Sequence, residues 1–118
     1  MENKYVKRFP EVPSFKQKGF DGFTAELNCE NIGFTFEDVY QGHEKYCTNL
    51  KSTHIYYVLE GTGKFKINGE IYSVKQGDII EIPANNKFIF AGKMKMLLIM
   101  SPKFNPKDEI IGENNDLY

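Results

Sequence analysis

The segment GKFKINGEIYSV (residues 63–74) constrains the fold more than any other stretch of this chain. Its central Asn68-Gly69 pair is the strongest two-residue signal for a β-hairpin, because both residue types tolerate the positive φ angles of a type I′ turn. Phe65 and Ile67 alternate with lysines before the turn, and Ile71 follows it. This alternation predicts two antiparallel strands with one buried and one solvated face.

Strand-like segments continue on both sides of this hairpin from Gly22 onward. The chain holds ten Phe and seven Tyr, and these bulky side chains suit the pleated faces of strands. Turn signals separate the segments, and Glu60-Gly61-Thr62-Gly63 is expected to end one strand before the next begins. Short strands at this spacing predict an all-β barrel or sandwich. The expected strands are residues 23–29, 32–40, 54–61, 63–69, 70–74, 78–83, 87–92 and 94–102.

A chain of 118 residues fits one domain. Residues 1–21 are expected to form an N-terminal arm with short edge strands, because Pro10 and Pro13 lack the N–H donor that a central strand needs. Residues 22–106 form the expected barrel. Residues 107–118 form a polar C-terminal tail, and its end is expected to be frayed.

Charge and hydropathy exclude several classes of partner. Fifteen Lys and Arg against sixteen Asp and Glu give a formal net charge of -1, which provides no attraction to nucleic acid or to an anionic membrane. We find no apolar core of a secretory signal and no run of apolar residues long enough to span a bilayer, so we expect a cytoplasmic protein. Cys29 and Cys47 lack CxxC spacing and are expected to stay thiols there.

The middle of the chain resembles the cupin superfamily, whose members are short β-barrels with two conserved motifs. The first motif, G-x5-H-x-H-x3-E-x6-G, matches this chain in spacing, and so does the second, G-x5-P-x-G-x2-H-x3-N. The stretches YVLEGTG (57–63) and GDIIEIP (77–83) also resemble cupin strands and turns. The resemblance covers residues 40–101 and implies a double-stranded β-helix, or jelly-roll, barrel. The residues at the motif positions are Gly42, Thr48, Leu50, His54 and Gly61, then Gly77, Pro83, Asn85, Phe88 and Gly92.

Most of the ligands that hold a metal in cupins are replaced in this chain. Thr48 and Leu50 stand at the two first His positions, His54 at the Glu position and Phe88 at the last His position. Neither Leu nor Phe has a lone pair for a divalent metal. We therefore expect no metal cofactor.

In an alternative register of the first motif, Cys47 and Asn49 stand at the first two His positions in place of Thr48 and Leu50. Together with His54 and the nearby His43, Cys47 would then supply a thiolate and two imidazoles for a divalent metal such as zinc. Strand alternation does not point Cys47 and His54 to one face unless a bulge intervenes. This register stays open as a degenerate metal site.

If the barrel closes as the resemblance implies, His54, Tyr56 and Val58 face its interior, together with Ile80, Ile82 and the inward residues of the last strand. Such a mixture of aromatic walls and a few polar groups is typical of a small-molecule site. The alternative is that the aromatic side chains fill the barrel. The predicted ligand-binding pocket consists of Thr48, Leu50, His54, Tyr56, Phe88 and Phe90.

His54 is the candidate general acid or base, with the Tyr56 phenol as proton donor. This pair is similar in kind to the His base and Tyr acid of the metal-free sugar epimerases of the cupin superfamily. Asp78 and Glu81 are candidates to orient His54, by proximity alone. His43, in a lysine-rich turn, is expected to be a solvated loop residue.

The sequence therefore predicts a metal-free cupin barrel that binds a small molecule, such as a sugar or a small organic acid, in carbohydrate metabolism. The barrel is expected to form a homodimer through sheet edges and the N-terminal arm. A metal-independent sugar epimerase or isomerase that uses His54 and Tyr56 is the second hypothesis. A degenerate metalloenzyme that uses His43, Cys47 and His54 is the third.

Overall fold

The computed structural model describes residues 5–118, so the first four residues of the predicted arm lie outside it. Nine strands and one short 3₁₀ helix make up the described part of the chain, which confirms the all-β prediction. No helix in residues 5–118 is long and apolar enough to cross a membrane. The elements are β1 Phe15–Gln17, β2 Phe20–Thr24, β3 Gly33–Val39, β4 Lys45–Asn49, β5 Thr53–Ile67, β6 Glu70–Lys75, β7 Ile79–Ile82, β8 Phe88–Ser101, η1 Pro106–Asp108 and β9 Glu109–Asn114.

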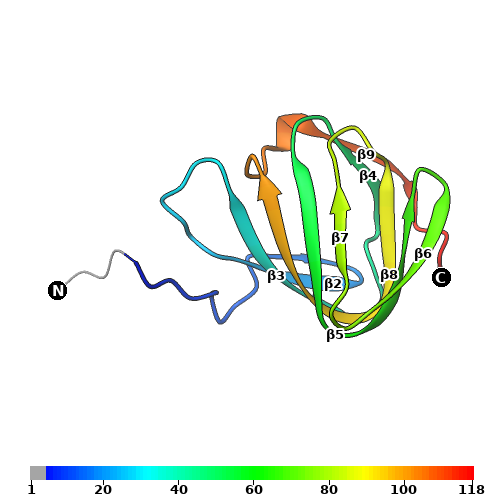
Figure 1. Cartoon of the computed structure of the whole chain (residues 1–118), viewed down its shortest axis with the longest axis horizontal. Helices are drawn as coiled ribbons and strands as arrows, with labels where there is room; N and C mark the ends of the chain where they lie inside the picture. Colours follow the sequence, from blue (N-terminus) through cyan, green and yellow to red (C-terminus); the bar gives the residue numbers. More distant parts are fainter. Residues whose placement is uncertain (1–4) are drawn as a thin grey trace.

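The strands form one curled sheet whose two halves share the long strands β5 and β8 (Figure 1). In one half, the second part of β8 pairs with β3 and with the first part of β5, and β2, β1 and β7 extend this half. In the other half, the first part of β8 pairs with the end of β5 and touches β4, and β6 and β9 extend it. The two long strands thereby curl the sheet into a barrel.

The hairpin predicted from the sequence is confirmed. Asn68 has φ 49° and Gly69 has φ 87°, which are the left-handed angles of a type I′ turn, and the turn joins β5 to β6 in the expected register. The prediction of a second turn, at Glu60–Gly63, is wrong. The chain continues through it as one strand with a register shift between Val58 and Glu60, because a bulge lets a strand bend without ending.

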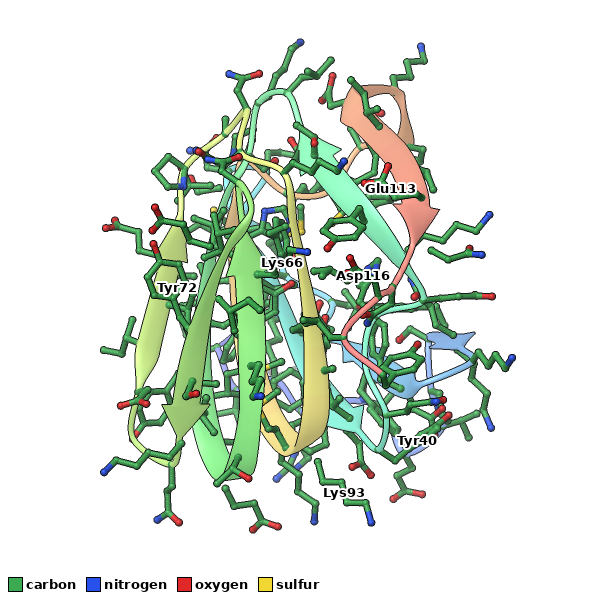
Figure 2. All side chains as sticks on the ribbon, turned by 90° about the vertical axis from the view of Figure 1, so that its right-hand side faces the viewer. Tyr40, Lys66, Tyr72, Lys93, Glu113 and Asp116 are labelled. Carbon is green, nitrogen blue, oxygen red and sulfur yellow. The ribbon has the colours of Figure 1, made fainter. Side chains whose placement is uncertain are left out.

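The end of the chain also differs from the prediction. The segment expected to be a polar tail contains β9, which pairs with β4 along Thr48 and Asn49. Strand β4 was itself not predicted, and β8 pairs with it only at Cys47, so β9 satisfies the backbone groups that this edge would otherwise expose. Figure 2 shows Asp116 beside Lys66, and Lys66 Nζ lies 3.1 Å from Asp116 Oδ2.

The interior follows the alternation expected from the sequence. Val58, Ile80, Ile82, Met96 and other inward residues are buried. A cluster of phenylalanines packs around Tyr56, with ring centroids 5.1 to 6.1 Å apart, and fills part of the barrel. The rings that contact Tyr56 are those of Phe65, Phe88 and Phe90.

Candidate active site

A cavity of about 910 Å³ lies inside the barrel beside this aromatic cluster. Its walls come from β1 to β5, β8, β9 and the loop between β2 and β3. Apolar groups provide the larger part of the lining, and polar and titratable side chains provide the rest. This volume and lining are those of a site for a small molecule. The polar residues discussed below are Gln17, Glu37, His43, Cys47, His54, Tyr56 and Glu109.

His43 lies in the cavity wall, half-buried, so its prediction as a solvated loop residue is wrong. Its Nδ1 lies 2.6 Å from the carbonyl oxygen of Lys45. A carbonyl only accepts hydrogen bonds, so Nδ1 carries the proton and Nε2 keeps the lone pair, which accepts a hydrogen bond from the Gln17 amide. Gln17 Nε2 lies 3.4 Å from His43 Nε2. Burial lowers the pKa of His43, so near neutral pH the ring is an uncharged base with a fixed tautomer.

Aromatic rings and the backbone fix the position of His43. Its ring stacks on Phe20 and meets Phe90 edge-on, both at centroid distances of 5.5 Å. Its backbone N–H donates to the Phe90 carbonyl at 3.0 Å, and Asn115 Nδ2 donates to the His43 carbonyl at 2.8 Å. The side chain is therefore presented to the cavity by a rigid part of the fold.

Gly42, the first motif glycine, is what allows this backbone approach. Its φ is 151°, and a Cβ there would lie 2.5 Å from the Phe90 carbonyl oxygen and 2.8 Å from Ala91 Cα. Only glycine adopts such a conformation readily. Gly42 thus lets the chain pass close to β8 immediately before His43.

Gly42→Ala is expected to lower the free energy of unfolding by about 1–3 kcal/mol, since both the backbone angle and the clash with β8 must be relieved. Urea denaturation measures the change. Gly77→Ala is the matched control, because Gly77 also has a left-handed φ, of 92°, but a Cβ there meets nothing within 4 Å. Equal losses in the two variants would contradict the close approach described for Gly42.

His54 and Tyr56 face the barrel interior as predicted, 5% and 2% exposed. Burial, and next a positive charge on His43, lower the pKa of His54 to about 4. Burial also raises the pKa of the Tyr56 phenol well above its usual range. Both side chains are therefore neutral near pH 7.

Glu37 is a cavity residue that the sequence analysis missed. It lies on the inner face of β3 and is 3% exposed, and burial raises its pKa to about 8. Its Oε1 has no hydrogen-bond partner among residues 5–118. Strand alternation over IGFTFEDVY could have placed Glu37 inside the barrel, on the same face as Thr35 and Val39.

Glu109 is the second missed residue, and it comes from β9. Asn49 Nδ2 donates to Glu109 Oε2 at 2.8 Å, while Asn49 Oδ1 accepts from the backbone N–H groups of Lys51 and Ser52. Burial raises the pKa of Glu109. Burial, and next the charge of Glu109, raise the pKa of the Cys47 thiol above its usual range, so Cys47 is not a thiolate nucleophile.

The predicted pocket is only partly the observed one. His54 and Tyr56 line the cavity, whereas Thr48, Leu50, Phe88 and Phe90 are absent from its lining. Leu50 is 43% exposed in the turn after β4, and Phe88 and Phe90 are buried in the aromatic cluster. Phe88 and Phe90 thus fill one part of the barrel, as the alternative interpretation held for the aromatic residues, while the cavity occupies another part. Asp78 and Glu81 do not line this cavity either.

The residues present do not fit the metal that cupins commonly hold. No three His, Cys, Asp or Glu side chains in the described part of the chain come together as a metal-binding group. Cys47 and His54 do line one cavity, because they lie on the separate strands β4 and β5 and alternation along a single strand does not apply to them. Together with His43 they still form no such group, and His54 alone of the four first-register positions carries a nitrogen ligand.

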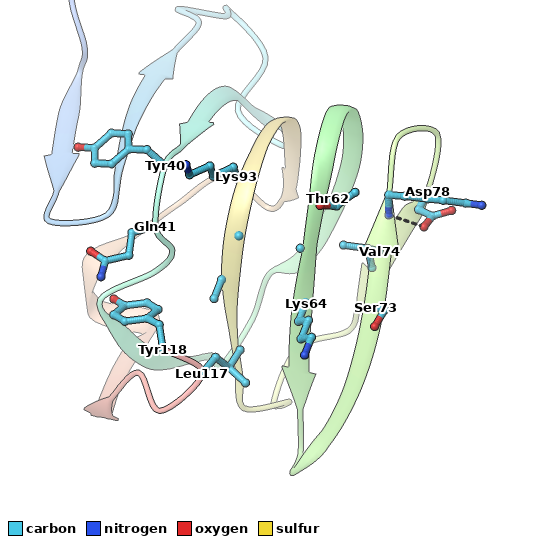
Figure 3. Close-up of a pocket in the computed structure, with 14 residues that line it drawn as sticks. Tyr40, Gln41, Thr62, Lys64, Ser73, Val74, Asp78, Lys93, Leu117 and Tyr118 are labelled. Atoms are coloured by element: carbon cyan, nitrogen blue, oxygen red, sulfur yellow. Dashed lines mark hydrogen bonds between the residues drawn. The ribbon is translucent and has the colours of Figure 1, made fainter.

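A second, shallower groove of about 830 Å³ lies outside the barrel (Figure 3). Tyr40 and Lys93 lie at one side of it, and Ser73 and Asp78 lie at the other. The Asp78 carboxylate accepts a hydrogen bond from the backbone N–H of Lys75 at 2.8 Å. The groove is open to solvent and includes none of the polar residues listed for the barrel cavity, so that cavity is the candidate active site.

Known proteins resemble this chain at the level of sequence and of structure. The model of the cupin domain family matches residues 50–100. A 5-nitrosalicylic acid 1,2-dioxygenase from Bradyrhizobium sp. is 37% identical over 83 residues, which are 70% of this chain and 38% of the dioxygenase. The chain therefore matches well under half the length of that relative.

Among solved structures, a variant of Streptomyces PAC13 with uridine is 29% identical to this chain, with a TM-score of 0.88 over 96% of this chain and 93% of that one. A structure of Pac13, described as a unique nucleoside dehydratase, is 28% identical, with the same TM-score over 95% and 93%. The motif spacing, the family match and this nearly complete superposition agree, and the chain belongs to the cupin superfamily.

Proposed function

We propose that this protein is a metal-independent acid–base enzyme that eliminates water from a nucleoside-type substrate in the barrel cavity. The observation that carries this proposal is His43, a neutral imidazole whose Nδ1 donates a hydrogen bond to the Lys45 carbonyl and whose unprotonated Nε2 lies in the cavity wall with only a long contact, of 3.4 Å, to the Gln17 amide. The cavity of about 910 Å³ lies in the size range of small-molecule sites.

Likeness to Pac13 supports the substrate class. The Streptomyces PAC13 structures that contain uridine include one variant with a histidine changed to glutamine and two with a tyrosine changed to phenylalanine. The cavity of this chain also presents histidine and tyrosine side chains, His43, His54 and Tyr56. This proposal narrows the sugar or organic acid expected from the sequence to a molecule that joins a sugar to a base.

The chemistry needs only one mobile proton. His43 Nε2 accepts a proton from a carbon of the substrate, and the electron pair of that C–H bond forms the new C=C bond. The C–O bond to the neighbouring carbon breaks, and the leaving hydroxyl takes a proton from the imidazolium to depart as water. Throughout, Nδ1 keeps its proton and its hydrogen bond to the Lys45 carbonyl, so His43 returns to its starting tautomer. His43 replaces His54 as the proposed base.

The proposal is tested by incubating the purified protein with uridine and its oxidised and deoxygenated analogues, and following loss of water by mass spectrometry. We expect turnover of at least one analogue, and no loss of rate after treatment with a metal chelator, because the described side chains offer no metal-binding group. Loss of turnover on chelation, restored by one added metal, would contradict the metal-independent mechanism.

Binding without chemistry is the second candidate function, since most of the cavity wall is apolar. The same panel of uridine analogues distinguishes binding without chemistry from catalysis. Tight nucleoside binding with no turnover of any analogue would make the protein a binding module, as first predicted from the sequence.

A further inference from the structure

Neither the fold nor the mechanism above explains why a carboxyl group is buried at Glu37. On the inner face of β3 it is paired with Gly22 on one side and Met96 on the other, so neither neighbour provides a hydrogen-bond donor from its side chain. Thr35 and Val39 precede and follow it on the same face. Its Oε1 is left without a partner within residues 5–118, although the side chain lines the cavity.

Leaving such a group without a hydrogen bond lowers the stability of the folded protein, because the group has lost its hydrogen bonds to water. The side chain is not needed to fill space, because an apolar residue of the same size would do so without this cost. Burial holds the carboxyl protonated near neutral pH, with a pKa of about 8. A neutral carboxylic acid has an O–H donor and a C=O acceptor side by side. A ligand that pairs with both of these groups must present a hydrogen-bond acceptor beside a donor, and few ligand groups do so.

We propose that Glu37 binds the ligand by its amide edge, an N–H group beside a C=O group, through two parallel hydrogen bonds. The ligand class is therefore a lactam or imide, such as a pyrimidine base. This inference rests on the proposed function, because a nucleoside with a pyrimidine base has such an edge. Glu37 would select the base, while His43 acts on the sugar.

Three charged residues of the cavity wall, Lys7, Glu26 and Lys103, are exposed to solvent. The titratable groups that are at least partly buried leave this assignment intact near neutral pH. The thiol of Cys47 and the phenol of Tyr56 interact electrostatically with Glu37, and both stay protonated because burial raises their pKa values. His54 stays neutral, with a pKa of about 4, and burial also lowers the pKa of His43. Glu109 is held by Asn49. Among these groups, Glu37 is the one that is expected to change charge near pH 8.

Calorimetric titration of three ligands tests the inference: uridine, N3-methyluridine and 5-methyluridine. N3-methylation removes the donor of the imide edge, whereas 5-methylation adds the same bulk and keeps the edge. We expect the wild type to bind N3-methyluridine at least tenfold more weakly than uridine, and to bind 5-methyluridine within threefold of uridine.

Two variants at position 37 complete the test. Glu37→Gln keeps a donor beside an acceptor and should bind uridine within about threefold of the wild type. Glu37→Met keeps the volume but loses both groups, and should bind uridine at least tenfold more weakly, with no preference over N3-methyluridine. The affinity of the wild type should fall between pH 7 and 8.5 as the carboxyl loses its donor, while that of Glu37→Gln should not. Circular dichroism verifies that both variants are folded.

The outcomes separate this inference from the proposed function. Equal binding of uridine and N3-methyluridine by the wild type, or unchanged uridine affinity in Glu37→Met, would overturn the inference and leave the proposed function standing. Glutarimide, which carries the imide edge without a sugar, serves as the separate probe. Binding of glutarimide that depends on Glu37, without any nucleoside binding, would overturn the proposed function and support the inference. Binding of neither probe would overturn both.

Discussion

His43→Gln is expected to lower kcat for water elimination by about 10²–10⁴-fold, the usual contribution of a general base. KM should change little, because glutamine is polar and can occupy the space beside Phe20 and Phe90 without offering a basic nitrogen. Steady-state kinetics on the analogue that turns over in the wild type measure both quantities. A large rise in KM with unchanged kcat would mean that His43 only binds substrate.

The pH dependence and the second histidine provide the controls for His43. Its pKa is lowered by burial, so the neutral base persists below the usual range of histidine, and the fall of kcat/KM at acidic pH should begin below that range. His54→Gln tests the base predicted from the sequence. Abolished turnover in His54→Gln with near-normal turnover in His43→Gln would reverse the assignment.

Glu37 is expected to make the protein less stable as pH rises, by about 2 kcal/mol between pH 6.5 and 8.5. Its pKa of about 8 in the folded protein lies above the ordinary value of 4.5, so the folded state holds a proton that the unfolded state releases. This contribution is full below pH 4.5 and is lost as pH rises through 8. Because Glu37 is 3% exposed, solvent screening reduces the effect little. Urea denaturation at the two pH values measures it.

Glu37→Gln is the matched control, since it keeps the shape and has no proton to lose. Between pH 6.5 and 8.5 the free energy of unfolding should fall less in the variant than in the wild type. The difference between the two losses should be about 2 kcal/mol, the contribution assigned to Glu37. The interval starts at pH 6.5 so that His54 does not contribute. The pKa of His54 is lowered to about 4 in the folded protein, so this residue makes the protein less stable as pH falls from 6.5 to 4, the opposite direction from Glu37. Parallel pH profiles of wild type and variant would show that Glu37 is ionised in the folded protein.

The sequence was most informative where structure depends on neighbouring residues. The Asn68-Gly69 turn is specified by two adjacent side chains and was predicted correctly, and so was the inward direction of His54 and Tyr56 along one strand. The cupin motif spacing added long-range information that local patterns lack. These signals were sufficient for the fold class.

The site was harder to predict because it is built from segments far apart in the sequence. Glu109 belongs to a strand whose partner, β4, was not predicted, so nothing local indicated its role. His43 looked solvated because its neighbours in sequence are charged, yet Phe20 and Phe90 from other strands enclose it. Gly61 looked like a turn residue, but β8 pairs alongside it and keeps β5 continuous. In each case a distant strand decided the outcome.

The wide sequence separation of the groups that hold His43 has a consequence for how the proposed activity would arise during folding. Gln17 and Phe90 contact its ring and Asn115 donates to its backbone carbonyl, and these residues come from the beginning, the late middle and the end of the chain. Bringing such distant segments together is the slow, entropically costly step of β-barrel folding. A partly folded chain could therefore already contain the hairpin at Asn68-Gly69, yet its histidine would be neither oriented nor enclosed. Enzymatic activity should then appear late in refolding, as a more stringent measure of the native state than strand content.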